Sequence, residues 1–172
     1  MSKHIVSVVV LAALAWSLAA PLGAQTRPIP IVEAMAGWAG FVDENWIDRT
    51  LLGAAGRIFV TERIAVGPEF AFLRGSHDEY DWTLTGNATI DLIRDTGGAA
   101  PRIVPYLAFG GGYLRQVTRF GTARFSSGEG TVSGGAGARF SLGRRLFLAP
   151  ELRVGYEPEL RFGASLGFRP GR

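Results

Sequence analysis

The sequence predicts an all-β fold, an eight-stranded antiparallel up-and-down transmembrane β-barrel, and three observations support this prediction. Eight segments alternate between apolar and small or polar residues with a period of two, as strands with one apolar face do. Stretches rich in Gly, Pro, Asn and Asp separate these segments. Isolated arginines fall on the face opposite the apolar one, where they avoid the cost of about 2–4 kcal/mol that Arg incurs in lipid.

The first 24 residues are expected to be a cleaved signal peptide. Lys3 and His4 precede an apolar run over 5–20, and the small residues of PLGA precede Gln25. The alternative is an uncleaved transmembrane helix, but the run is shorter than the ~20 residues that a span needs. Residues 25–172 then form one barrel domain. The chain has no cysteine and a net charge of only +3, so disulfides are excluded and nucleic acid is not an expected partner.

The strand segments follow one another along the rest of the chain. The first four are 31–40, 50–60, 63–74 and 81–91. In the fourth, Trp82 and Leu84 share one face, whereas Thr83, Thr85 and Asp91 share the other. The last four are 102–114, 130–142, 145–156 and 159–168. Their lengths suit tilted membrane strands, which need ~9–11 residues.

The connections follow from the even number of strands, which returns both chain ends to the periplasmic side. Periplasmic turns are expected at 61–63, 92–101 and 143–144, and outside connections at 41–49, 75–80, 115–127 and 157–158. The region 115–127 could instead rise as a hairpin with Val117, Phe120 and Phe125 along an exposed edge. Ordinary loop packing is the preferred interpretation.

The polar face distinguishes a membrane barrel from a soluble one. It consists mostly of Gly, Ala, Ser and Thr with isolated charges of both signs. A surface in water would carry more charge, whereas the interior of a narrow barrel needs small residues beside a few large ones. The membrane barrel is therefore preferred, and a soluble periplasmic lipid-binding barrel remains as an alternative.

Two sets of candidate residues follow from the alternation. Aromatic residues near the outer ends of the strands would form a rim at the membrane surface: Trp38, Trp46, Trp82, Tyr113 and Tyr156. Balanced charges would face the lumen beside Tyr106, and they should pair because unpaired buried charge is costly. This lumen charge network comprises Glu33, Arg57, Glu69, Asp91, Arg139, Glu151, Arg153 and Arg161. It would fill the lumen as a plug or, alternatively, rearrange as a gate.

One stretch of the sequence occurs twice. RIFVTERIAVGPEF at Arg57 resembles RFSLGRRLFLAPEL at Arg139, and each contains a Pro-Glu pair. The two copies should lie on opposite sides of the barrel, through duplication or through similar demands on two equivalent hairpins. Because proline cannot donate to a strand ladder, a bulge is expected at Pro68 and at Pro150.

PYLAFGGGY at Pro105, RLFLAPELRVGY at Arg145 and the final strand ending on Phe168 carry a family resemblance. The chain resembles the small eight-stranded outer-membrane barrels, the OmpA/OmpX-like β-barrel domain family, although RPGR follows the terminal aromatic residue. The resemblance implies residence in the outer membrane of a Gram-negative-type envelope and no cofactor. The implied partners are outer-membrane lipid, lipopolysaccharide and, during insertion, the barrel assembly machinery.

The expected function is non-enzymatic, an envelope-structural or surface-interaction role for a monomer. An eight-stranded lumen is only wide enough for its own side chains, which argues against general porin activity. A lipid A-modifying enzyme is the alternative from another class, with His77 between Ser76 and Asp78 as its weak candidate site. A metal site at His77, Asp78, Glu79 and Asp81 is equally weak, and a solvated loop is the simpler interpretation.

Overall fold

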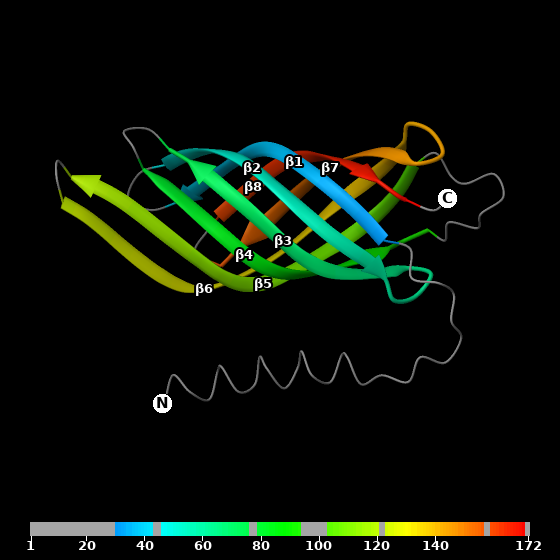
Figure 1. The fold of residues 1–172 in the computed structure, drawn as a ribbon, viewed down its shortest axis with the longest axis horizontal. Helices are drawn as coiled ribbons and strands as arrows, with labels where there is room; N and C mark the ends of the chain where they lie inside the picture. Colours follow the sequence, from blue (N-terminus) through cyan, green and yellow to red (C-terminus); the bar gives the residue numbers. More distant parts are fainter. Residues whose placement is uncertain are drawn as a thin grey trace, which may run out of the picture.

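The computed structural model describes residues 30–42, 46–75, 79–93, 103–120, 123–156 and 159–170. They form a closed barrel in which every strand pairs with its neighbour in the sequence and β1 closes on β8, all antiparallel (Figure 1). The predicted fold class is thereby confirmed. No helix among the described residues is long and apolar enough to cross a membrane. The strands are β1 (Pro30–Val42), β2 (Trp46–Phe59), β3 (Ile64–Arg74), β4 (Tyr80–Asp91), β5 (Ile103–Phe120), β6 (Ala123–Ser141), β7 (Leu146–Gly155) and β8 (Glu159–Phe168).

The two ends of the barrel differ. At one end, here called the terminus end, β1 begins, β8 ends and short turns join β2 to β3 and β6 to β7. At the other, here called the hairpin end, β5 and β6 run past the remaining strands (Figure 1). The predicted signal peptide and the residues Ser76, His77 and Asp78 lie outside the described residues.

The apolar face of the strands lies on the outside of the barrel. Leu84 is 52% exposed, whereas the next residue, Thr85, is 6% exposed and faces the lumen. An apolar exterior around a polar lumen suits a barrel surrounded by lipid and is the reverse of a soluble lipid-binding barrel. One outward residue from each strand, with an exposure between 46% and 58%, illustrates the pattern: Val32, Leu52, Phe70, Leu84, Phe109, Val132, Leu152 and Phe162.

Two expected outside connections are strands instead. β5 and β6 pair without a break from Ile103↔Phe140 to Phe120↔Ala123, so the preference for a packed loop over 115–127 was wrong. The β-branched and aromatic residues of this region favour an extended chain, and they outweighed its serines and glycines. Val117 is 1% exposed and therefore does not line an exposed edge, whereas Phe125 is 62% exposed. Similarly, β1 and β2 extend into the connection expected at 41–49.

The repeated prolines interrupt the ladder without a bulge. Between β2 and β3, pairing stops at Ala55↔Glu69 and resumes at Ile58↔Val66 in the same register, so the residues beside Pro68 are unpaired on that side. A bulge would have shifted the register by one residue, and the expected bulge was therefore wrong. The missing proline N–H removes a ladder bond, but pairing of Pro68 with Gly86 on the opposite side continues and maintains the register.

The same interruption occurs in the second copy of the repeat. Between β6 and β7, pairing stops at Gly137↔Glu151 and resumes at Phe140↔Leu148, again in an unchanged register. Pro150 meanwhile pairs with Ala164 on β8. The two copies therefore lie on opposite walls of the barrel, as expected from the sequence, and share one backbone feature.

Candidate functional site

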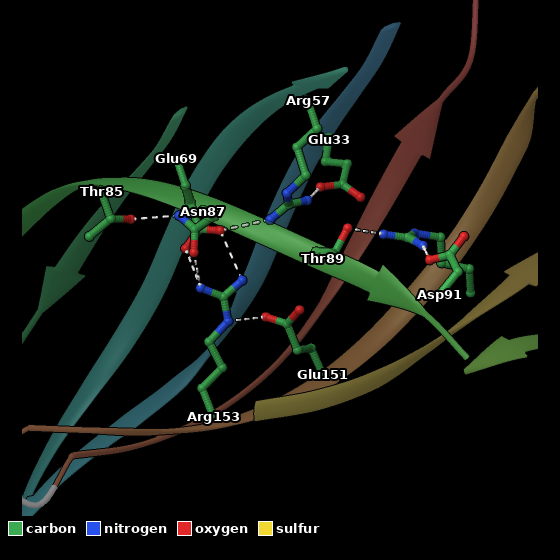
Figure 2. A network of polar contacts seen from close by, with 10 residues as sticks. Glu33, Arg57, Glu69, Thr85, Asn87, Thr89, Asp91, Glu151 and Arg153 are labelled. Carbon is green, nitrogen blue, oxygen red and sulfur yellow. Dashed lines mark hydrogen bonds and ion pairs between the residues drawn. The ribbon is translucent and has the colours of Figure 1, made fainter. Parts of the chain in front are cut away.

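Arg153 lies at the centre of the lumen. Its guanidinium donates from Nη2 to Glu69 Oε2 over 3.1 Å, from Nε to Glu151 Oε1 over 2.5 Å and from Nη1 to Asn87 Oδ1 over 2.6 Å (Figure 2). Asn87 in turn donates from Nδ2 to Thr85 Oγ1 over 2.7 Å. One cation thus joins β3, β4 and β7 across the lumen, with the planar fork geometry that makes Arg suited to binding several acceptors.

Arg57 extends this cluster to β2 and β1, beside β3. Its Nη2 donates to Glu69 Oε2 over 2.8 Å, and its Nη1 forms an ion pair with Glu33 on β1. All three side chains are at most 5% exposed. Glu69 therefore accepts from two arginines, and removing one cation from such a cluster would leave a buried carboxylate undercompensated.

A second cluster lies nearer the terminus end. Arg139 forms an ion pair with Asp91, donates to Thr89 Oγ1 over 2.9 Å and lies with its guanidinium carbon 4.2 Å from the centre of the Tyr106 ring. The buried ring provides a cation–π contact. Tyr106, which was expected to fill the lumen, is 3% exposed.

The lumen contains further charges that were not in the predicted network, namely Arg49, Glu79, Asp81 and Glu159, whereas Arg161 was predicted. Arg161 pairs with Glu159 on its own strand, and Arg49 binds Glu79 over 2.9 Å and Asp81 over 3.2 Å at the hairpin end. The alternation places Asp81 and Glu159 on the lumen face, so the sequence contained a signal for both. Arg49 was missed because it was assigned to a connection.

Two of the three acidic residues that the sequence offered as metal ligands, Glu79 and Asp81, bind an arginine instead, and the third, Asp78, lies outside the described residues. Arg49 approaches both Glu79 and Asp81. No group of three or more His, Cys, Asp or Glu side chains in the described parts of the chain could hold a metal ion.

Apolar layers lie on both sides of the central cluster. On the side of the terminus end, Phe147 and Ile31 are at most 2% exposed, and on the side of the hairpin end Leu73 and Ala71 are fully buried. The layer toward the terminus end consists of Ile31, Tyr106, Ala108, Phe147 and Ala149. The layer toward the hairpin end consists of Ala39, Leu51, Ala71 and Leu73, with Met35 and Phe41 packed against it. The ionic cluster is consequently sandwiched between apolar side chains.

A small cavity of about 40 Å³ lies between the central cluster and β8. Gly163 and Ser165, two small residues of β8, line it together with Glu151, Arg153 and Arg161. A buried water needs roughly 10–15 Å³ of such volume, so the cavity has room for about three waters. Space for the network to rearrange is therefore available on this side of the lumen.

The described side chains of the aromatic rim point outward. Trp82 and Tyr113 lie 5.7 Å apart between ring centres, and Trp38 donates from Nε1 to Asp48 over 3.0 Å. Tyr156 is 70% exposed. The side chain of Trp46 lies outside the described part of the structure.

Comparison with solved structures identifies similar folds. Neisserial surface protein A matches with a TM-score of 0.71 and 11% identity, over 81% of this chain and 96% of its own. The N-terminal β-barrel domain of Pseudomonas aeruginosa OprF matches with a TM-score of 0.64 and 16% identity, over 83% of this chain and 99% of its own. Ail, the attachment invasion locus protein of Yersinia pestis, matches with a TM-score of 0.54 and 11% identity, over 83% of this chain and 95% of its own.

No family model and no curated protein matches the sequence. The structural matches cover nearly the whole length of each solved barrel, and their low identities make the likeness one of fold. The chain therefore has the fold of the small eight-stranded outer-membrane β-barrels, the architecture that its resemblance to OmpA/OmpX-like barrels implied.

Proposed function

We propose that this protein is a non-enzymatic barrel of the outer membrane in a Gram-negative-type envelope, with an envelope-structural or surface-interaction role and a lumen closed by its own ionic network. The observation that carries the proposal is the buried cluster around Arg153, which joins opposite walls between two apolar layers inside an apolar exterior. The proposal includes export through a cleaved signal peptide, insertion by the barrel assembly machinery and a monomeric state.

Closure follows from the order of the layers in the lumen. A hydrated ion entering from either end would meet apolar side chains beside carboxylates that are already bound to arginine, Asp81 at the hairpin end and Asp91 at the terminus end, and then the central cluster. Breaking a buried pair costs about 3–5 kcal/mol because the remaining charge is left uncompensated. The lumen of an eight-stranded barrel is only wide enough for its own side chains. The lumen is therefore closed, and the protein does not conduct like a wide porin.

A surface role is supported by the long hairpin of β5 and β6. β4 pairs with β5 only as far as Tyr80↔Val117, and β7 pairs with β6 only as far as Ser133↔Gly155. The hairpin therefore stands beyond the other strands (Figure 1). With the terminus end facing the periplasm, as the short turns favour, this hairpin projects from the cell.

The experiment combines membrane fractionation with conductance. The folded protein should sediment with outer membranes and resist SDS until heated, because a closed ladder has no edge from which to unfold. In a planar bilayer it should pass little or no current. A large steady conductance, or a monomer soluble without detergent, would contradict the proposal, whereas a small flickering current would favour a gate over a fixed plug.

A further inference from the structure

The two turns that belong to the repeat share one backbone geometry at the terminus end. In the turn between β2 and β3, the N–H of Val60 donates to the carbonyl oxygen of Ile64 over 2.9 Å. In the turn between β6 and β7, the N–H of Leu142 donates to the carbonyl oxygen of Leu146, also over 2.9 Å. Three residues form the tip of each turn, so the side chains at the two tips can be compared position by position.

The charges at the two tips differ. The first tip carries Glu62 beside Arg63, whereas the equivalent positions of the second tip carry Arg144 and Arg145. All four residues are exposed. A carboxylate and a guanidinium thus stand together on one turn, and two guanidinium groups stand together on the other.

The neighbouring strand increases this contrast. The backbone N–H of Asp91 donates to the carbonyl oxygen of Arg63 over 2.8 Å, and the backbone N–H of Arg169 donates to that of Arg145 over 2.9 Å. The guanidinium carbon of Arg169 lies 5.0 Å from the centre of the buried Phe147 ring. A carboxylate therefore adjoins the first turn where a third arginine adjoins the second, which makes the β6–β7 turn the more positive of the two.

Apolar side chains reach the base of the β6–β7 turn on the outside of the barrel. Leu142 is 62% exposed, and Leu146 is 46% exposed. Arg144 lies two residues from each of them, and a strand advances only ~3.4 Å per residue. Arginine keeps its aliphatic stem along apolar surface and its charged head in a polar layer. The turn therefore presents two cations where the lipid-facing wall ends.

We propose that the β6–β7 turn binds the headgroup of an anionic glycerophospholipid through Arg144 and Arg145. The inference rests on the proposed function, which places the terminus end in the periplasmic leaflet. Arginines form charge-assisted hydrogen bonds with phosphate oxygens, while Leu142 and Leu146 contact the beginning of the acyl chains. A zwitterionic headgroup such as phosphatidylethanolamine carries an ammonium group that two arginines repel. The β2–β3 turn, with its glutamate, should not retain such a lipid.

The test counts lipids retained by the folded barrel, using native mass spectrometry after extraction from vesicles of equal parts phosphatidylglycerol and phosphatidylethanolamine. We expect R144Q and R145Q each to weaken retention of phosphatidylglycerol by about fivefold, which corresponds to the ~1 kcal/mol that one cation contributes near an anionic surface. R63Q removes the arginine equivalent to Arg145 from the first turn and should leave retention unchanged. E62R gives the first turn the paired arginines of the second, and it should add one bound phosphatidylglycerol.

Four results would overturn the site: unchanged retention by both R144Q and R145Q, an equal loss in R63Q, no additional lipid on E62R, or equal retention of the two phospholipids by the unmodified protein. SDS resistance before heating is measured on every sample. A barrel that folds in lipid but shows no preference for phosphatidylglycerol contradicts this inference alone. A chain that stays soluble and never forms the SDS-resistant barrel contradicts the proposed function as well.

Discussion

The β2–β3 and β6–β7 hairpins occupy opposite walls and repeat one pattern, in which an inward Arg is followed by a Pro-Glu pair. Their backbones behave alike, since both ladders are interrupted beside the proline. Their arginines do not behave alike. Arg57 pairs with Glu33 and Glu69, whereas Arg139 pairs with Asp91 and stacks on Tyr106.

The neighbouring strands account for this difference. Glu33 on β1 pairs with Ala55, and in the second copy the equivalent ladder position opposite Gly137 holds Tyr106 on β5. The carboxylate of Glu33 therefore contacts Arg57, whereas the aromatic ring of Tyr106 contacts Arg139. The repeated pattern therefore sets the backbone position of each arginine and points its side chain into the lumen. The neighbouring strand determines which group the guanidinium contacts.

One residue links the two halves. Arg153 binds Glu69 from the first copy and Glu151 from the second, and the position equivalent to Arg153 in the first copy is Ala71. The largest expected effect therefore comes from Arg153→Met, which removes the link while keeping much of the volume. We expect it to lower the free energy of unfolding by about 3–5 kcal/mol, because Glu151 loses its cation, buried Glu69 keeps only Arg57 and buried Asn87 loses its donor. Urea unfolding in lipid vesicles, followed by tryptophan fluorescence, measures this. A loss below about 1 kcal/mol would show that the halves are held independently.

The two glutamates provide a matched pair of variants. Glu69 accepts from two arginines and its side chain is 3% exposed, whereas the side chain of Glu151 is 20% exposed. We expect Glu69→Gln to cost about 3 kcal/mol and Glu151→Gln about 1 kcal/mol, since the second site is partly open and has fewer partners. The same urea titration compares them. Equal losses would mean that the copies are energetically equivalent despite their different surroundings.

Exchanging one residue between the hairpins tests the backbone. Gly67 in the first copy corresponds to Ala149 in the second, and a Cβ at Gly67 would lie 1.9 Å from the Gly56 carbonyl oxygen. Gly67→Ala should therefore cost about 1–3 kcal/mol through overpacking. The reciprocal Ala149→Gly should cost only about 0.5–1 kcal/mol through chain entropy. If Gly67→Ala is tolerated without loss, the two interruptions are interchangeable.

The smallest expected change in stability concerns Tyr106, whose ring takes the position that Glu33 has in the first copy of the repeat. Tyr106→Leu removes the surface over which Arg139 lies at 4.2 Å. We expect a loss of about 1 kcal/mol, within the range of a partly desolvated cation–π contact. Tyr106→Phe retains the ring and serves as the control. Equal effects of the two variants would assign the contribution to the hydroxyl and not to the cation–π contact.

The sequence predicted the barrel and the faces of its strands because a lipid-facing surface imposes a strict alternation of residues. It also identified inward charges such as Arg57 and Glu69, which the structure finds buried. The sequence did not show which lumen side chains contact one another. Arg153 meets Asn87 only because barrel closure brings β4 and β7 within side-chain reach, and alternation along one strand contains no information about distance across a lumen.

The errors have a related cause. Gly and Ser at 126–130 are typical of turns in isolation, but pairing with β5 satisfies their backbone groups and extends β6. The expected bulges at the prolines failed because each proline retains a second neighbour, and that neighbour keeps the register. In both cases pairing with a neighbouring strand outweighed the conformational preference of the residues themselves.

The two ladder interruptions have a mechanical consequence. They lie on opposite sides of the closed sheet and divide the wall into two curved plates of four strands each, β3 to β6 and β7 through β8 and β1 to β2. A buried arginine Nε–H without an acceptor among the described residues accompanies each seam, on Arg57 and on Arg139. Lateral pressure from the bilayer would flatten such a tube along its seams before any plate bends. Deuterium should accordingly enter the amides of Gly56 and Ala138 sooner than those in the middle of either plate, so that the compliance of the wall depends on two prolines.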